Sequence, residues 1–345
     1  MVKLEVSVKE ILKMKKSNLV MAVLASAVLA CTSSAAFAKT YTIRVATYAG
    51  TDHPVSKSVE YFKENIERES NGQIKVQHFP NNQLGPEAVV IDQVKRGTVQ
   101  MAITGSQIRK DEPNIGLSDA PYLISSWKQA RAVYDEEGKK ILSGNYEKNT
   151  GVKIMAYFVN GFREVSANKP INTLEDLASL KLRIPDNEIH VHLFEALGSN
   201  NVMMPLTEVY NALETKMIDG QENPYSTLLS SGLYEVQTDV LETRHMFAIS
   251  PVLMNGKFYN KLPDDLKKLV NDWIAKTEVY NWDLSEKDDD ASKKTLQEKG
   301  LTIHPLTDEM RAQIEAKMGD FYKWYETIIP DAPKWIEHCK ARADK

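Results

Sequence analysis

Cysteine is nearly absent from this sequence, whose 345 residues include two, Cys31 and Cys339. Because Cys31 falls in an N-terminal leader that is expected to be removed, the remaining chain has one cysteine and cannot form an internal disulfide. The fold must therefore be held together by its hydrophobic core. A chain of roughly 300 residues can bury a large core and is expected to form two lobes.

The sequence also lacks the short motifs that are typical of common enzyme chemistries. It has no G-x-S-x-G, H-E-x-x-H, G-x-G-x-x-G or P-loop pattern. His190 and His192 are two positions apart on a helical pattern, so they face different directions and are poorly placed to share a metal ion. The acidic run at residues 286–290 lacks the glycine and terminal glutamate of a calcium loop, which favours a solvated helix face. We expect no cofactor and no metal.

Long basic tracts and long apolar runs are missing as well. The leader carries five lysines and two glutamates, so the rest of the chain has 38 basic and 45 acidic side chains and a net charge of −7. No basic patch indicates nucleic-acid binding, and no segment after residue 38 could span a membrane.

The first thirty-eight residues have the pattern of a secretory signal peptide. Residues 13–16 are basic, residues 19–30 form an apolar run of twelve, and residues 36–38 form an A-x-A cleavage site. We expect export to the periplasm and cleavage after about Ala38. Met14 is a candidate true start, which would leave residues 1–13 outside the protein. Cys31 follows an imperfect lipobox, so lipid attachment at Cys31 is the alternative.

Strand and helix patterns alternate along most of the remaining chain. Thr173 and Thr207 are candidate N-caps for two of the helices. The alternation predicts α/β lobes whose sheets are covered on both faces. The predicted strands are residues 41–46, 74–79, 101–104, 153–158 and 181–184, and the predicted helices are residues 55–70, 86–96 and those that begin at Leu174 and Glu208.

The C-terminal third has a different pattern. Residues 264–299 contain neither proline nor glycine, and apolar residues recur there at helical spacing. At ~1.5 Å per residue this helix would be on the order of 50 Å long, which exceeds one small lobe. We therefore expect it to lie across two lobes.

Two arginines in apolar surroundings are the most informative residues of the chain. Arg163 follows Gly161 and Phe162, and Arg183 lies between Leu182 and Ile184 in a short extended run. A buried guanidinium needs an anion, because an unpaired buried charge costs several kcal/mol. The anion is either a carboxylate of the protein or a bound ligand.

The block that contains these arginines resembles the extracytoplasmic solute-binding subunit of tripartite ATP-independent periplasmic (TRAP) transporters, the DctP-like family. The resemblance covers nearly all of the chain after the leader, including the long helix. The matching segments are residues 161–163, 170–171, 174–177, 180–185, 196–198, 208–210 and 219–224, together with 83–85 and Glu87.

The resemblance implies a type II-like periplasmic binding protein, in which two α/β lobes are joined by hinge strands and spanned by a long helix. We predict a first lobe of residues 39–160 plus roughly 249–288, and a second lobe of residues 161–248 plus roughly 289–330. Residues 331–345 would form a C-terminal helix or tail.

The resemblance also implies roles for three residues of the second lobe. Arg183 matches the arginine that pairs with the ligand carboxylate, and a planar guanidinium can donate two parallel hydrogen bonds to such a group. Arg163 matches a second pocket arginine, with surface pairing as the alternative. Asn223 matches the asparagine that supplies a hydrogen bond to the ligand, with an Asx turn leading into Pro224 as the alternative. Tyr225 is a further candidate.

Ligand contacts from the first lobe are expected after its strands, where α/β folds place them. Glu87 is the principal candidate, although an acidic residue after Pro86 also suits an ordinary helix start. Tyr48, Asp52 and His53 follow the first strand, and Asp52 has the alternative of capping the next helix. Weaker candidates on neighbouring loops are Gln83 and Ser106.

The expected function is capture of a small carboxylate by lobe closure and its delivery to the integral membrane permease subunits of a TRAP transporter. The chain is expected to act as a monomer, without nucleic acid. A sugar acid such as a uronate or aldonate is favoured over a C4-dicarboxylate, because an acidic side chain would repel a dianion. A 2-oxo acid is a further alternative for the ligand. The alternatives are a ligand-sensing module for a membrane receptor, and an exported enzyme that uses Glu87 and Glu222 as a carboxylate pair.

Overall fold

The computed structural model describes residues 39–343. The predicted leader, with Cys31 and the cleavage site, lies outside the described residues. Within residues 39–343, no helix combines the length and the apolar character needed to cross a bilayer.

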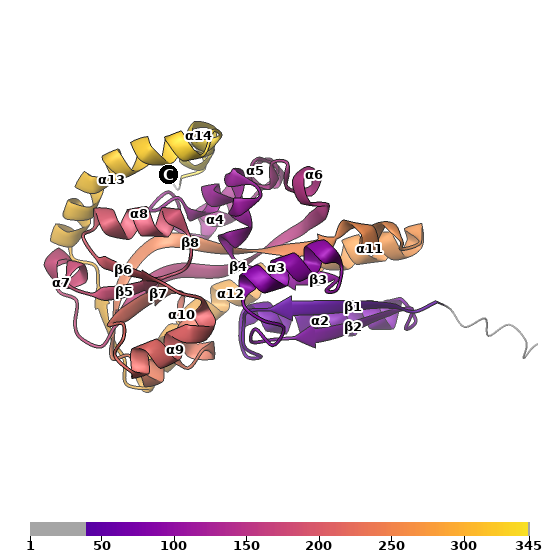
Figure 1. Ribbon diagram of the computed structural model, residues 1–345, viewed down its shortest axis with the longest axis horizontal. Coiled ribbons are helices and arrows are strands. Elements are labelled where there is room, and N and C mark those ends of the chain that lie inside the picture. The colour runs from indigo at the N-terminus through magenta and orange to yellow at the C-terminus, as the bar shows by residue number, and fades with distance from the viewer. Residues whose placement is uncertain (1–38, 344–345) are drawn as a thin grey trace, which may run out of the picture. The chain divides into compact units, whose positions relative to one another are not determined.

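A single nine-stranded sheet runs through the whole of the described fold (Figure 1), in the order β2-β1-β3-β8-β4-β7-β5-β6, with β9 paired to β8. Its centre is the antiparallel pair of β4 and β8, which we call the central ladder. Most other pairs are parallel, as expected where helices connect the strands. The strands are β1 (Tyr41–Thr47), β2 (Ile74–Phe79), β3 (Met101–Ile103), β4 (Val152–Ala167), β5 (Lys181–Ile184), β6 (Asn200–Met203), β7 (Gly220–Asn223), β8 (Asp239–Asn255) and β9 (Thr302–Pro305).

Lobe I is the end of the sheet formed by β1, β2 and β3. The apolar positions Val55, Val59, Phe62 and Ile66 of α2 (Pro54–Glu69) are all buried against one face of these strands. On the other face lies α3 (Glu87–Arg96), which begins after Pro86 and ends at Gly97 in the left-handed conformation. The lobe also includes α11 (Gly256–Asn260), η1 (Ser106–Lys110) and η2 (Pro113–Asp119).

Lobe II is the opposite end of the sheet, formed by β5, β6 and β7 (Figure 1). Thr173 caps α7 and makes a reciprocal capping box with Asp176. The lobe contains α7 (Leu174–Ala178), α8 (Glu188–Ala196), α9 (Leu206–Glu214), α10 (Tyr225–Ser230) and η3 (Leu233–Glu235).

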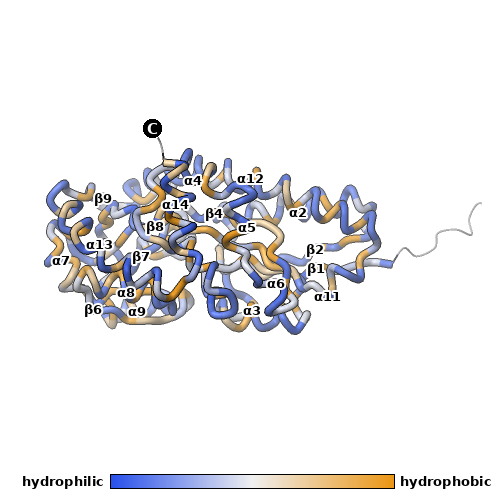
Figure 2. Tube along the Cα trace, turned by 90° about the horizontal axis from the view of Figure 1, so that it is seen from above, coloured by the Kyte–Doolittle hydropathy of each residue, from blue (hydrophilic) through white to orange (hydrophobic). Residues whose placement is uncertain are grey.

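The remaining helices pack around the central ladder. The helix α12 (Asp264–Glu298) contacts α2 of lobe I, β4 of the ladder and α10 of lobe II, so it spans both lobes. The largest apolar cluster joins the ladder and α8 to a group of flanking helices. These helices are α4 (Trp127–Val133), α5 (Glu136–Ser143), α13 (Asp308–Ile328) and α14 (Ala332–Ala341). The short helix α6 (Tyr146–Thr150) packs instead with α3 and the start of β4, in a separate cluster. In Figure 2 the hydrophobic colour gathers along β4 and β8, at the centre of the fold.

The central ladder is irregular where the two lobes meet. Val159 pairs with Ile249 and Gly161 pairs with Ala248, so Asn160 is an extra residue that forms a β-bulge. Gly161 has a φ of 107°, a conformation that L side chains rarely adopt. A second irregularity follows Arg163. Bulges bend a strand and re-aim its side chains, so these positions suit both a hinge and a ligand site.

The predicted α/β architecture is confirmed, and the long helix lies where the sequence places it. The predicted strand at residues 153–158 is the beginning of the much longer β4. The N-cap assigned to Thr207 is wrong, because Pro205 is the cap and α9 already begins at Leu206. The predicted lobe boundaries stay a prediction.

Candidate functional site

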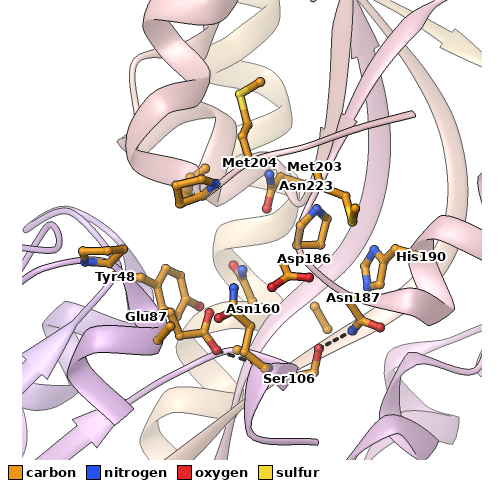
Figure 3. Close-up of a pocket in the computed structure, with 18 of the residues that line it drawn as sticks. Tyr48, Glu87, Ser106, Asn160, Asp186, Asn187, His190, Met203, Met204 and Asn223 are labelled. Atoms are coloured by element: carbon orange, nitrogen blue, oxygen red, sulfur yellow. Dashed lines mark hydrogen bonds between the residues drawn. The ribbon is translucent and has the colours of Figure 1, made fainter. Parts of the chain in front are cut away.

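A cavity of about 470 Å³ lies between the two lobes, over the bulged part of the central ladder. Figure 3 shows Tyr48 and Glu87 on the side of lobe I, and Met203, Met204 and Asn223 on the opposite side. The volume lies in the range of sites for small organic ligands. The ladder contributes Asn160, Arg163, Ala248, Ile249 and Ser250 to its wall.

Arg183 lines this cavity from β5 and is 4% exposed. Its Nε and Nη2 both donate to the carbonyl oxygen of Met204, at 3.0 and 2.7 Å. Among residues 39–343, no carboxylate lies within 4.0 Å of this guanidinium. Burial lowers the pKa of Arg183 to about 10, so the group remains charged at neutral pH. A buried cation without a protein carboxylate is suited to an anionic ligand.

Arg163 differs from Arg183, because it is paired inside the protein. Its Nε donates to Oε2 of Glu222 and its Nη2 donates to Oε1 at 2.8 Å, in a two-pronged ion pair. Glu222 is fully buried and also faces His190 at 3.1 Å and His245 at 3.0 Å. Burial alone would raise the pKa of Glu222, but the charges of Arg163 and His190 hold it well below its usual range.

His190 is enclosed by two carboxylates. Its Nδ1 is 3.1 Å from Oε1 of Glu222, and its Nε2 is 3.9 Å from Oδ1 of Asp119. Burial opposes the charged imidazole, but these two carboxylates outweigh it and raise the pKa of His190. Asp119 in turn accepts a hydrogen bond from Asn187 at 2.6 Å. Both His190 and Asp119 line the cavity.

Glu87 is a second carboxyl group of lobe I that lines the cavity. It lies in the first turn of α3 and accepts a hydrogen bond from the backbone of Gln107 at 3.3 Å. Burial raises the pKa of Glu87 to about 7, although backbone hydrogen bonds from Gln107 and Gly105 and the charge of Arg183 oppose the shift. The group can therefore present either a carboxylate or a carboxylic acid near neutral pH.

The variant Glu87→Gln should make the ligand-free protein more stable at pH 8. A carboxyl group whose pKa is higher in the folded state than its unfolded value of 4.5 destabilises the folded state increasingly as the pH rises from 4.5 to about 7. The free energy of unfolding should rise by up to about 3 kcal/mol at pH 8, and the gain should vanish near pH 4.5. Denaturant titration at both pH values measures this difference in the free energy of unfolding.

The control is Asp92→Asn, on the exposed side of the same helix. A gain that is equal at both pH values would rule out the buried carboxylate as its cause.

Tyr48 and Asn160 form the end of the cavity nearest the start of α2. The hydroxyl of Tyr48 is 2.8 Å from that of Ser250, so lobe I contacts the ladder here. Nδ1 of His53 accepts from the backbone of Val55 and thereby caps α2, which leaves Nε2 to donate to Oδ1 of Asn160 at 2.9 Å. His53 therefore positions Asn160 and does not line the cavity.

Six of the ten residues predicted for the site line the cavity, and four lie elsewhere. Asp52 is exposed and does not cap α2, because His53 provides the cap. Gln83 is exposed, and its neighbour Asn82 lines the cavity instead. Tyr225 is buried, with its hydroxyl directed to Glu242 at 2.8 Å. The residues that line the cavity are Tyr48, Glu87, Ser106, Arg163, Arg183 and Asn223.

Asn223 occupies the end of β7, beside the bulge of the ladder. Its Nδ2 donates to Oε1 of Gln221 at 2.6 Å, which fixes the amide and leaves its carbonyl oxygen available to the cavity. The neighbouring Pro224 begins the turn into α10, in agreement with the sequence pattern.

Several lining residues were not predicted from the sequence. Asn160 could have been found, because a glycine within a strand often marks a bulge and Asn160 precedes Gly161. His190 and Asp119 carry no local signal, because their proximity depends on the packing of α8 against η2.

The sequence profile of the bacterial extracellular solute-binding proteins, family 7 (DctP), matches residues 45–327. An uncharacterised protein of Haemophilus influenzae is 34% identical over 85% of this chain and 90% of its own length. The chain therefore belongs to this family, the extracytoplasmic solute-binding subunits of TRAP transporters.

Two solved structures show the same two-lobed fold. A sugar acid binding protein from Advenella mimigardefordensis in complex with galactonate has a TM-score of 0.85 and 29% identity, over 88% of this chain and 99% of its own. A TRAP periplasmic solute binding protein from Sulfurospirillum deleyianum with bound succinate has a TM-score of 0.83 and 29% identity, over 88% of this chain and 100% of its own. The family thus includes proteins that bind a sugar acid and proteins that bind a dicarboxylate.

Proposed function

We propose that this chain captures a hydroxylated monocarboxylic acid, a sugar acid such as an aldonate or uronate, in the periplasm. The observation that carries the proposal is the charge of Arg183, which has no carboxylate partner among residues 39–343. The ligand carboxylate would complete the two-pronged pairing that a guanidinium favours.

The balance of charges around the cavity supports one negative charge on the ligand. Arg163 and His190 are both engaged by Glu222, and the cavity residue Asp186 pairs with Lys110 at 2.6 Å. A second carboxylate would therefore find no free cation among the lining residues that the structure describes, and would lie near Glu87 or Asp119. Hydroxyl groups would instead find acceptors at Glu87 and Asn223.

Closure of the lobes is the mechanism that this arrangement favours. Arg183 and Asn223 belong to lobe II, Tyr48 and Glu87 belong to lobe I, and the cavity floor is the bulged ladder that joins them. A ligand that contacts both lobes only in the closed form shifts the population toward that form. The closed monomer would then deliver the acid to two membrane permease subunits.

The chain is proposed to release its ligand unchanged. The alternative of an exported enzyme required Glu87 and Glu222 to face each other across the cleft. Glu222 is fully buried and holds Arg163, His190 and His245. This arrangement supports a structural role for Glu222.

A thermal-shift screen tests the proposed function. A ligand that binds only the folded state raises stability by RT ln(1 + [L]/Kd), so the tightest ligand should give the largest shift. We expect aldonates and uronates to raise the Tm more than succinate, malate or a 2-oxo acid at equal concentration, with calorimetry to confirm the order. Tighter binding of a dicarboxylate would reject the monoanion, and the absence of binding by every organic acid would reject the function.

A further inference from the structure

One wall of the cavity is built from polar side chains of three separate elements. Ser106 comes from η1, Asp119 ends η2, and Asn187 and His190 lie at the beginning of α8. Figure 3 shows Nδ2 of Asn187 donating to the hydroxyl of Ser106, at 3.0 Å. We call this group the polar wall. It joins lobe I to lobe II independently of Arg183.

Within the polar wall, Asp119 and His190 face each other across a gap. The distance of 3.9 Å between Oδ1 of Asp119 and Nε2 of His190 is too long for a direct hydrogen bond. Oδ2 of Asp119 is held by Asn187 at 2.6 Å, and Nδ1 of His190 is held by Glu222 at 3.1 Å. Both side chains are thus fixed by their other atoms, and Asp119 and His190 are 7% and 2% exposed.

The geometry determines which atoms carry hydrogen. A carboxylate only accepts, so Nδ1 of His190 is the donor toward Glu222. Nε2 faces the second carboxylate, that of Asp119, which favours a hydrogen on this nitrogen as well. The pair therefore presents one N–H donor and one carboxylate acceptor side by side at the cavity.

We propose that His190 and Asp119 form a subsite for one hydroxyl group of the ligand, which accepts from Nε2–H and donates to Oδ1. This inference rests on the proposed function, because it concerns the part of the acid beyond the carboxylate at Arg183. The subsite selects a neutral group that both donates and accepts. A ligand carboxylate is repelled by Asp119, an ammonium is repelled by His190, and a methylene leaves both polar atoms unpaired.

Calorimetric titration with galactonate and gulonate, each with its set of mono-deoxy derivatives, tests the subsite. One position of the ligand should be decisive, and removal of its hydroxyl should weaken binding to the wild-type protein about tenfold or more. In Asp119→Asn the amide oxygen accepts from Asn187, so an N–H faces the ligand where Oδ1 accepted. In His190→Gln the amide nitrogen donates to Glu222, so the amide oxygen faces the ligand where Nε2–H donated. Both variants should bind the hydroxylated acid about tenfold more weakly but bind the decisive deoxy derivative nearly as well as wild type. The ratio of the two affinities should therefore fall toward one.

His192→Gln is the matched control. His192 lies on the same helix but stacks on Trp324 at 3.8 Å, outside the cavity, so the ratio should stay at its wild-type value. Retained affinity for the deoxy derivative shows that each variant is folded and that its Arg183 anchor is intact.

The two proposals fail in different ways. If the wild type binds a hexonate but no mono-deoxy derivative is weakened more than about twofold, or if the ratio persists in both variants, the subsite is rejected and the proposed function stands. If no sugar acid binds the wild type, the proposed function is rejected and the subsite with it.

Discussion

The variant Arg183→Ala should bind the acid found in the screen about 30-fold to several-thousand-fold more weakly than the wild type. Truncation of one partner of a buried charge pair costs ~2–5 kcal/mol, and here the ligand carboxylate is the partner left unpaired. Among residues 39–343 the guanidinium of Arg183 pairs with no carboxylate, so the substitution breaks no ion pair within the protein. The variant should therefore lose affinity for the ligand and keep its stability. Calorimetry measures the affinity, and thermal unfolding without ligand measures stability.

Two further variants sharpen this result. Arg183→Lys keeps the charge but loses the two-pronged geometry, so its loss should be smaller than that of alanine but still measurable. Arg96→Ala removes an exposed arginine that pairs with Asp92 at 2.6 Å, and should leave the affinity unchanged. Near-native affinity of Arg183→Ala would reject Arg183 as the anchor. A large loss of stability without ligand would show that its main role lies in the fold.

The variant Glu222→Gln should lower the free energy of unfolding by ~3–5 kcal/mol, the range for breaking a buried ion pair by removing one partner. It leaves the buried His190 and the half-buried Arg163 without the carboxylate that both now face. The folded-state pKa of Glu222 is well below the unfolded value of 4.5, so its stabilisation is present above pH 4.5 and is lost as the pH falls through the folded-state pKa. The difference from wild type should therefore be full at pH 7 and should shrink as the pH falls below 4.5 toward the folded-state pKa.

Denaturant titration at pH 7 and below pH 4 measures this difference, and Glu195→Gln provides the control, because Glu195 is exposed on α8. A loss of unfolding free energy below about 1 kcal/mol at pH 7 would mean that Glu222 does not form a stabilising buried ion pair with Arg163 and His190. Binding of the acid should also weaken, because Arg163 and His190 both line the cavity.

The sequence predicts the bounds of a helix or strand well where a local sequence signal is sufficient to set them. Residues 74–79 and 181–184 are strands with the predicted bounds, and α12 follows the long stretch without proline or glycine. The lengths of β4 and β8 were not predicted, because a strand buried on both faces shows no regular alternation of apolar and polar residues. The sharing of one sheet by both lobes is a long-range property of these two strands.

The site was predicted in part, for a related reason. Arg183 could be found because a charged residue between apolar neighbours in a short strand is expected to be buried and therefore to need an anionic partner. The internal pairing of Arg163 could not, since Glu222 reaches it across the β4–β7 ladder, 59 positions away. His53 was assigned to the ligand because of its position after β1, but the same position lets it cap α2 and hold Asn160.

The bulge at Asn160 restricts how this binding site can diversify. The same short stretch of the ladder contacts the cavity and joins the two lobes, so a substitution there alters both ligand contact and the freedom of the lobes to move. Side chains such as Glu87 and Met203 line the cavity from the lobes and lie outside the ladder. Adaptation to a new acid is therefore expected at the lobe positions, with the ladder sequence retained.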